Sequence, residues 1–238
     1  TPSAADPLPV EFLLHSLSQA MPDGASLVEE VPSHRPAMQK FMPMRGQDSF
    51  YTMASGGLGY SLPAAVGMAL GKPKSRTVCL IGDGSAMYSI QALWTAAQRK
   101  LPLTVVIINN SGYGAMRSFS QVMQVRNVPG LELPGIDFVR LAEGMGCHAV
   151  RVSKAAELGE ALKRGMAHDG TSLVEVVVDS TVPVLYASAG VCHVLVDASA
   201  DLDDAVRIAV NAKVKRPSVC NAIETLLVHS DVAAEFLP

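Results

Sequence analysis

Apolar residues up to about residue 179 follow two alternating patterns. Short runs rich in Val, Leu and Ile, typical of strands buried on both faces, lie between longer stretches with helical spacing, such as Phe12, Leu13 and Leu17. The predicted strands are 26–31, 76–81, 103–108, 148–152 and 172–178, and the predicted helices are 10–20, 61–70, 86–99, 136–145 and 155–167. Alternating strands and helices predict an α/β fold, a doubly wound and mostly parallel sheet with helices on both faces.

A shorter segment follows with the same rhythm. Residues 191–196, 202–212 and 223–228 predict a strand, a helix and a second strand. We therefore expect two domains, 1–180 and 181–238, of which the second is a short α/β tail, too small to bury much apolar surface alone. Within the first domain, the loop 118–134 contains Gly and Pro, and we expect it to be mobile without a bound cofactor.

Polar residues follow two of the predicted strands at the point where each strand ends. Asp83 lies in a Gly-Asp-Gly turn after strand 76–81, and Asn109 and Asn110 end strand 103–108. The carboxyl ends of parallel strands share one edge of an open α/β sheet, where such sheets bind ligands. A glycine backbone can approach phosphate oxygens, and a carboxylate is a hard ligand for Mg²⁺. A Gly-Asp-Gly sequence alone is also an ordinary turn, but together with the Asn pair it predicts a magnesium and diphosphate site.

Four longer runs carry a family resemblance. They are Ala54-Ser-Gly-Gly-Leu-Gly-Tyr-Ser-Leu-Pro-Ala-Ala65, the seventeen residues from Gly82 to Gln98, Asn109-Asn-Ser-Gly-Tyr-Gly-Ala-Met-Arg117, and Pro129-Gly-Leu-Glu-Leu-Pro-Gly-Ile-Asp-Phe138. With them, residues 9–179 resemble the C-terminal, diphosphate-binding domain of the benzoylformate decarboxylases, which use thiamine diphosphate (ThDP). Other ThDP decarboxylases and synthases share the first two runs in outline, whereas the last two favour the benzoylformate branch.

The resemblance implies roles for individual residues. The Mg²⁺ ligands would be Asp83, Asn110 and the backbone carbonyl of Gly112. The residues implied to contact ThDP are Gly56, Leu58, Gly82, Gly84, Ser85 and Tyr113. Among these, Gly56 would accept a hydrogen bond from the aminopyrimidine ring, and Leu58 would lie beneath the cofactor and keep it bent. Ala115, Met116 and Phe119 would line the substrate pocket, where their apolar character suits an aryl group; without the resemblance, core packing is the simpler interpretation of these three.

The implied activity is decarboxylation of an aromatic 2-oxo acid. In this family the amino group of the bent cofactor removes a proton from the thiazolium ring, and the ring accepts the electrons left by CO₂. A glutamate and histidines from an N-terminal, pyrimidine-binding domain complete the site. No such segment lies in this sequence, so we expect it to hold half a site, completed by that domain or by a second subunit. The resemblance also implies a homo-oligomer for the full-length enzyme.

The sequence departs from the family pattern at Glu30-Val-Pro-Ser-His34. Relatives often carry hydroxyl residues here, around the diphosphate. Ser33 is a candidate for this contact, whereas His34 is predicted to be a surface or linker residue.

The tail resembles a different family. The runs Gly190-Val-Cys-His-Val-Leu-Val-Asp197, Ala200-Asp-Leu-Asp203 and the fourteen residues from Arg216 to His229 resemble an internal segment of γ-glutamyl phosphate reductase. This resemblance places Cys220 at the nucleophilic cysteine, whose thiolate attacks an acyl phosphate or aldehyde. Because the dinucleotide-binding domain and most of the catalytic domain of that family have no counterpart in this sequence, a free thiol without catalytic chemistry is the simpler interpretation of Cys220. Three alternatives stay open: a ThDP decarboxylase represented by its cofactor-binding part, an NADP-dependent reductase fragment that uses Cys220, and a non-catalytic composite of the two.

Composition narrows the class of protein further. The formal net charge is -3 without a basic block, which argues against nucleic acid as the main partner. No apolar run approaches the roughly 18 residues that span a bilayer, and the first residues lack signal-peptide character, so we expect a cytoplasmic protein that is not bound to membranes. The cysteines show no metal-ligand spacing and are predicted to be reduced thiols.

Overall fold

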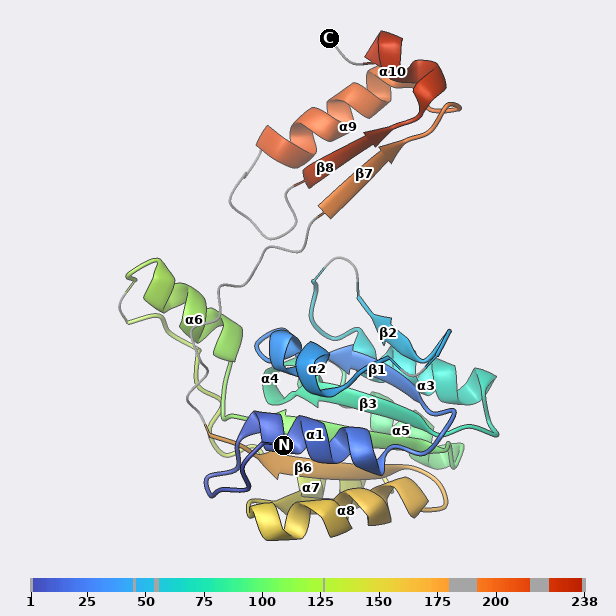
Figure 1. Ribbon diagram of the computed structural model, residues 1–238. Coiled ribbons are helices and arrows are strands. Elements are labelled where there is room, and N and C mark those ends of the chain that lie inside the picture. The colour runs from blue at the N-terminus through green and yellow to red at the C-terminus, as the bar shows by residue number, and fades with distance from the viewer. Residues whose placement is uncertain are drawn as a thin grey trace. The chain divides into compact units, whose positions relative to one another are not determined.

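The computed structural model describes residues 2–44, 46–53, 56–125, 127–179, 192–214 and 223–236 (Figure 1). Contacts between Cα atoms divide the chain into two compact units, Thr1–Leu185 and Tyr186–Pro238. We call them the large unit and the tail. The large unit contains a six-stranded sheet, and the tail contains a two-stranded sheet.

A parallel sheet forms the centre of the large unit. Its strands are β1 (Ser26–Glu30), β2 (Phe50–Thr52), β3 (Thr77–Gly82), β4 (Leu103–Asn109), β5 (His148–Val152) and β6 (Ser172–Val177), in the order β2-β1-β3-β4-β6-β5. Every neighbouring pair runs parallel, which confirms the predicted α/β fold. Five strands match the prediction to within one residue at each end. The pattern does not predict β2, because this short edge strand is only partly buried and has no apolar run.

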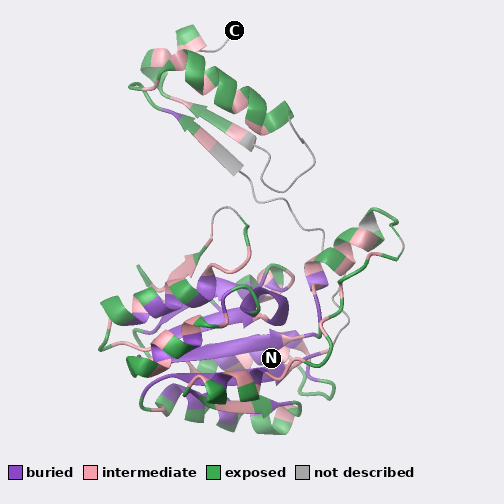
Figure 2. Cartoon of the chain, turned by 180° about the vertical axis from the view of Figure 1, so that it is seen from behind, coloured by how far each residue is buried: buried purple, intermediate pink, exposed green. Residues whose placement is uncertain are grey.

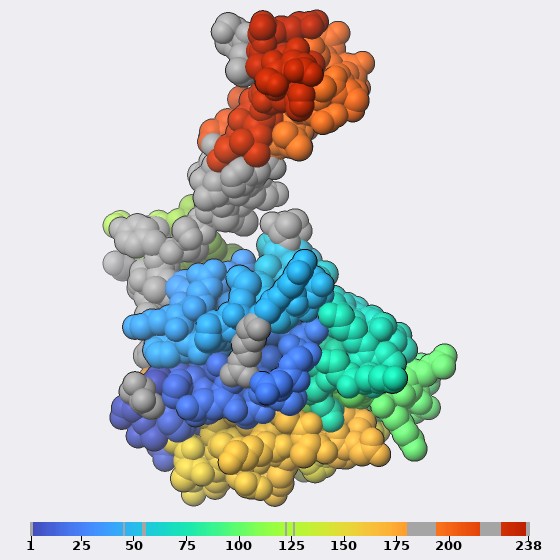
Figure 3. All heavy atoms as spheres, turned by 45° about the vertical axis from the view of Figure 1, so that its right-hand side comes forward, coloured from blue at the N-terminus to red at the C-terminus, as the bar shows by residue number. Residues whose placement is uncertain are grey.

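Helices cover both faces of this sheet, and the sheet between them is buried (Figure 2). The helices α1 (Val10–Ala20), α2 (Arg35–Phe41) and α8 (Ala155–Ala167) pack on one face, and α3 (Ser61–Gly71), α5 (Ala92–Gln98) and α7 (Phe138–Gly144) pack on the other. Successive strand residues point to opposite faces, so Leu80 enters the first core and Ile81 the second. On the surface, α1 and α8 lie side by side (Figure 3).

Two predictions of local structure are wrong in part. The predicted helix 86–99 is interrupted: α4 (Asp83–Ala86) is followed by turns over residues 87–91, in which the amides of Tyr88 and Ser89 each donate to the third residue before them, and only then by α5. The predicted loop 118–134 begins instead with the end of α6 (Gly114–Val122). The glycines and prolines that indicate a loop all lie after residue 128, so they do not oppose a helix over residues 118–122.

The predicted surface position of His34 is also wrong. Its side chain is only 5% exposed, at the N-cap position of α2. Burial lowers the pKa of the imidazole to about 4, although the negative charge of Glu11 raises it. The error follows from α2, a helix that the pattern does not predict and that folds this segment back onto the core.

The tail contains the predicted strand, helix and strand. Its strands β7 (Cys192–Val196) and β8 (Ile223–Val228) pair in parallel, with α9 (Leu202–Val214) between them in the chain and α10 (Ser230–Phe236) after them. Cys220 lies outside the described residues, so its predicted role as a nucleophile stays a prediction. Among the described residues of the whole chain, no helix combines the length and apolar character needed to cross a bilayer.

Candidate functional site

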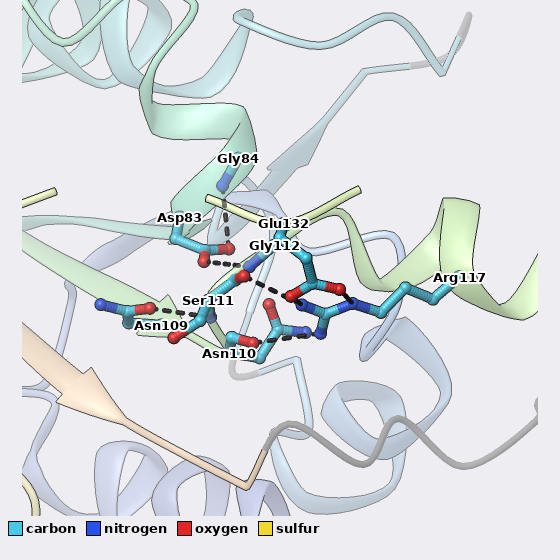
Figure 4. A network of polar contacts seen from close by, with 8 residues as sticks. All are labelled: Asp83, Gly84, Asn109, Asn110, Ser111, Gly112, Arg117 and Glu132. Atoms are coloured by element: carbon cyan, nitrogen blue, oxygen red, sulfur yellow. Dashed lines mark hydrogen bonds and ion pairs between the residues drawn. The ribbon is translucent and has the colours of Figure 1, made fainter. Parts of the chain in front are cut away.

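The predicted polar residues meet at the carboxyl edge of the sheet, between the ends of β3 and β4 (Figure 4). The register pairs Gly82 at the end of β3 with Ile108 near the end of β4. Asp83 then opens α4, and Asn110 begins the turn that leads to α6. Both strands end here because their apolar runs end, and the polar residues that follow are free to face a ligand.

Asp83 is the centre of a buried hydrogen-bond network. Its side chain is 2% exposed, its Oδ1 accepts a hydrogen bond of 2.8 Å from the amide of Gly84, and its Oδ2 accepts one of 2.8 Å from the amide of Gly112. Burial raises the pKa of the Asp83 carboxyl, although the two amides and the Arg117 guanidinium lower it. The carboxyl group therefore ties the turn after β3 to the turn after β4.

Asn110 points its amide at the same place. One atom of this amide lies 3.2 Å from Oδ1 of Asp83 and 2.8 Å from the carbonyl oxygen of Gly112. If that atom is the nitrogen, it donates a hydrogen bond to each oxygen. If it is the oxygen, three oxygens converge with no proton between them, which is the environment that a hard cation such as Mg²⁺ favours. In that second orientation the three predicted ligands have the oxygen chemistry and the mutual distances that a magnesium ion needs.

Asn109 is directed away from this group and acts on the backbone instead. Its amide nitrogen donates to Oε1 of Glu175 at 2.7 Å, and its Oδ1 accepts a hydrogen bond of 2.9 Å from the amide of Ser111. Glu175, 1% exposed on β6, also accepts from Arg151 on β5 at 2.9 Å. These contacts fix the turn 110–112 from the side of the sheet.

Arg117 holds the same turn from the side of α6. Its guanidinium donates to the carbonyl oxygens of Asn110 at 3.1 Å and Ser111 at 2.9 Å, and it pairs with Glu132. There is no room for a side chain at position 112, since a Cβ there would lie 2.3 Å from the carbonyl oxygen of Leu131. Arg117 and Glu132 were not predicted as supporting residues. The only signal in the sequence is that Arg117 ends one run with family resemblance and Glu132 lies within another.

Gly84, in the first turn of α4, packs against the ring of Tyr113. A Cβ on Gly84 would be 2.6 Å from the Tyr113 ring, so this position must be glycine while the ring stays in place. Ser85 is 4% exposed in the same turn, and Gly82 is the N-cap residue of α4. Burial raises the pKa of the Tyr113 hydroxyl, as do the neighbouring Tyr88 and Asp83. The structure therefore brings together the residues predicted to contact the diphosphate.

Gly56 and Leu58 lie in a separate segment, residues 56–60, which we call the Gly56 segment. Gly56 has φ +71° and is exposed, and Leu58 is half-buried. The segment meets the rest of the site through Tyr88, because a Cβ on Gly59 would lie 2.8 Å from the Tyr88 Cβ, and Tyr88 in turn is near enough to Tyr113 to raise the pKa of its hydroxyl.

The predicted pocket residues lie on α6. Met116 is 50% exposed, Phe119 is 37% exposed, and Ala115 is half-buried. Met116 and Phe119 are three residues apart and share one face of the helix. The alternative that they are core residues is wrong for these two side chains, since both stay open to solvent.

Comparison with known proteins assigns the large unit to a family. Residues 30–176 match the model of the thiamine pyrophosphate enzymes, C-terminal TPP binding domain, thiamine pyrophosphate being another name for ThDP. Benzoylformate decarboxylase of Pseudomonas aeruginosa is 41% identical over 170 residues, 71% of this chain and 32% of that enzyme. The crystal structure of benzoylformate decarboxylase from Polynucleobacter necessarius has a TM-score of 0.75 at 38% identity, over 78% of this chain and 36% of that one.

A separate match confirms the second resemblance. Gamma-glutamyl phosphate reductase of Geobacter metallireducens is 63% identical over 70 residues, which are 29% of this chain and 17% of that enzyme. The chain spans about a third of the length of the decarboxylases that it matches. Because the family model covers more than half of the sequence, the chain belongs to the thiamine pyrophosphate enzymes, through their C-terminal TPP-binding domain.

Proposed function

We propose that the large unit is the ThDP- and magnesium-binding half of a decarboxylase that acts on an aromatic 2-oxo acid. The observation that carries the proposal is the convergence of Asp83, Asn110 and the Gly112 carbonyl on one point at the carboxyl edge of the sheet. Two carboxylate or amide side chains and a backbone carbonyl match the oxygen ligands of Mg²⁺, which takes its remaining ligands from phosphate and water.

The neighbouring residues suit the diphosphate. Gly82, Gly84 and Ser85 offer backbone and a hydroxyl group around Asp83, and the Tyr113 ring closes one side. Gly56 and Leu58, on their own segment, would hold the aminopyrimidine ring. When bound, ThDP supplies an electron sink for the carbanion that remains after loss of CO₂. The residues of this chain would bind and orient the cofactor and keep the cation in contact with its phosphates.

The aromatic substrate is supported by α6. Met116 and Phe119 expose an apolar face next to the turn that holds the cation ligands, and both protein relatives described above are named for benzoylformate, an aryl 2-oxo acid. Ala115 lies on the first turn of the same helix and adds a small apolar side chain to this set.

The proposal includes a partner for the large unit. The matched relatives are about three times as long as the aligned part, so an N-terminal pyrimidine-binding domain or a second subunit would supply the groups that handle protons near the substrate. We propose a cytoplasmic homo-oligomer for the assembled enzyme. The buried free thiols of Cys79 and Cys147 agree with a reducing compartment.

The tail supports a second candidate function only by its match to γ-glutamyl phosphate reductase. A reductase fragment would need a dinucleotide site and the Cys220 nucleophile, which lies outside the described residues. The alternative to both candidates is a composite without catalytic activity, in which the large unit still binds its cofactor.

Calorimetric titration of ThDP with Mg²⁺ into the purified chain tests the proposal. We expect saturable, magnesium-dependent binding that is abolished in Asp83→Ala and kept in the matched variant Asp23→Ala, which changes an exposed aspartate. NADPH serves as a control ligand and binds only if the reductase candidate is correct. A chain that is folded by circular dichroism and binds no ThDP at millimolar concentration overturns the proposal.

A further inference from the structure

Two adjacent glutamates at the end of β1 are buried, which is unusual for charged residues in a strand. Glu29 is 0% and Glu30 is 4% exposed. A buried carboxyl group costs free energy unless hydrogen bonds replace its hydration. The contacts of the two side chains therefore indicate what they do.

Glu30 contacts only the backbone at the end of the Gly56 segment, as far as the described hydrogen bonds show. Its Oε1 accepts a hydrogen bond of 2.7 Å from the amide of Gly59, and its Oε2 accepts one of 2.7 Å from the amide of Ser61. Within the described residues, no Lys, Arg or His forms an ion pair with it. Both oxygens are thus used to hold a backbone that lies about thirty residues away in the chain.

The opposite side of Gly59 is also fixed. Gly59 has φ +94°, a left-handed conformation that favours glycine, and a Cβ there would lie 2.8 Å from the Cβ of Tyr88. Glu30 on one side and Tyr88 on the other leave the segment little freedom at this residue.

Glu29 acts before the segment begins. Its Oε1 accepts a hydrogen bond of 2.6 Å from Thr52, at the end of β2, and forms an ion pair of 2.7 Å with Arg35. The adjacent glutamates therefore hold the chain on both sides of Gly56 and Leu58, Glu29 at Thr52 and Glu30 at Gly59 and Ser61.

We infer that Glu30 is a positioning residue for recognition of the aminopyrimidine ring, separate from the residues that bind the diphosphate. Because it fixes the amides of Gly59 and Ser61, Glu30 determines the positions of Gly56 and Leu58, which would contact the ring. It makes no described hydrogen bond to the cation ligands or to Ser85, so we expect recognition of the diphosphate to depend on it much less than recognition of the ring. This inference rests on the proposed function.

The test compares two ligands on the same protein. ThDP and inorganic diphosphate, each with Mg²⁺, are titrated calorimetrically into the wild-type chain and into Glu30→Gln. The Gln amide accepts one backbone hydrogen bond but places an NH₂ group against the other amide, so we expect affinity for ThDP to fall about tenfold while affinity for diphosphate changes less than about twofold. A role in stability alone would leave the ratio of the two affinities unchanged at a temperature well below unfolding.

Glu175→Gln is the matched control. Glu175 is equally buried, but it holds Asn109 and hence the turn 110–112, so its substitution should weaken both ligands by the same factor. If Glu30→Gln does not fold, Gly59→Ala takes its place, because a methyl group against Tyr88 displaces the same segment and leaves Glu30 intact.

Each outcome decides the inference. A lower ratio of ThDP to diphosphate affinity in Glu30→Gln or Gly59→Ala, but not in Glu175→Gln, supports it. An unchanged ratio of ThDP to diphosphate affinity in these variants overturns the inference. A wild-type chain that binds the two ligands equally also overturns it, because such a chain would not recognise the aminopyrimidine ring. A folded wild-type chain that binds neither ligand overturns the proposed function, and this inference with it.

Discussion

The large unit and the tail share the strand-helix-strand repeat but differ in how much of it is covered. In the large unit, β4 lies between two layers of helices and is buried along almost its whole length. In the tail, Leu195 and Leu227 are neighbours in register on β7 and β8 and are 67% and 49% exposed, and α9 has no buried residue. Parallel sheets are stable when both faces are covered, so the repeat alone does not make a core.

The comparison also shows that high sequence identity and a well-formed candidate site need not occur together. The match to the reductase has the higher identity, 63% over 70 residues against 41% over 170 residues for the match to the decarboxylase, yet the large unit holds the buried polar network around Asp83. Sequence identity reports common origin, whereas a binding site needs a rigid scaffold that excludes water from its polar groups.

Hydrogen exchange should show the largest contrast. Because amides in a covered sheet exchange only through global or large-scale opening, we expect those of β4 and β6 to exchange several orders of magnitude more slowly than those of β7 and β8. Exchange of the native chain, followed by mass spectrometry of peptides, measures both regions in one sample. Equal protection in the two sheets would show that the tail is as well covered as the large unit.

Removal of a leucine from each sheet sharpens the comparison. Leu80→Ala, at a position that is 0% exposed, should lower the free energy of unfolding of the large unit by about 2–5 kcal/mol because it leaves a cavity. Leu195→Ala should change the free energy of unfolding of the tail by less than about 0.5 kcal/mol, because that side chain is already in solvent. Urea unfolding monitored by Trp94 fluorescence reports on the large unit, and hydrogen exchange of peptides from β7 and β8 reports on the tail. A large effect of Leu195→Ala would contradict the exposed assignment.

Acid should destabilise the large unit through His34. The pKa of this buried imidazole is lowered to about 4, below the value of 6.5 of an exposed one, so the unfolded chain binds the proton more tightly. The stability that neutral His34 contributes is fully present above pH 6.5 and is lost as the pH falls toward 4, by about 3 kcal/mol in all. His34→Gln should flatten this part of the profile of unfolding free energy against pH. An unchanged slope between pH 6.5 and 4 would assign the effect to other groups.

Glycine substitutions change stability less than Leu80→Ala does, and they compare two positions within the large unit. Gly112→Ala should cost about 1–3 kcal/mol of unfolding free energy and remove magnesium-dependent ThDP binding, because its Cβ would collide with the Leu131 carbonyl. Gly159→Ala, in α8 with no atom within 4 Å of the new Cβ, should stabilise the helix by about 0.5–1 kcal/mol and leave binding unchanged. Thermal unfolding and calorimetry measure the pair. Normal binding by Gly112→Ala would show that the turn tolerates a shift.

Much of the large unit was predictable because its signals are local. Residues 78–81 and 105–108 form continuous apolar runs, and Asp83 and Asn110 lie two residues after them, so strand identity and the parallel order were enough to bring the two side chains to one edge. The errors arose where local signals are weak. Helix α6 carries no strong start signal, and His34 is buried at the N-cap of α2, a helix that packs against α1 from a distant part of the chain.

The amino-acid sequence by itself determined the α/β class, the core strands and the family, and it singled out the residues that we propose as cation ligands, because each depends on residues that are adjacent in the chain or on short motifs. Only the tertiary structure decided which residues support that set. Arg117 with Glu132, Asn109 with Glu175, and Glu30 with the Gly56 segment are pairs separated by 15 to 66 positions. A buried carboxyl group costs free energy when it has no hydrogen-bond donors, and it fixes the backbone when amides lie within 3 Å of it. Which amides lie that close depends on how the chain packs, and the composition of the chain does not determine it.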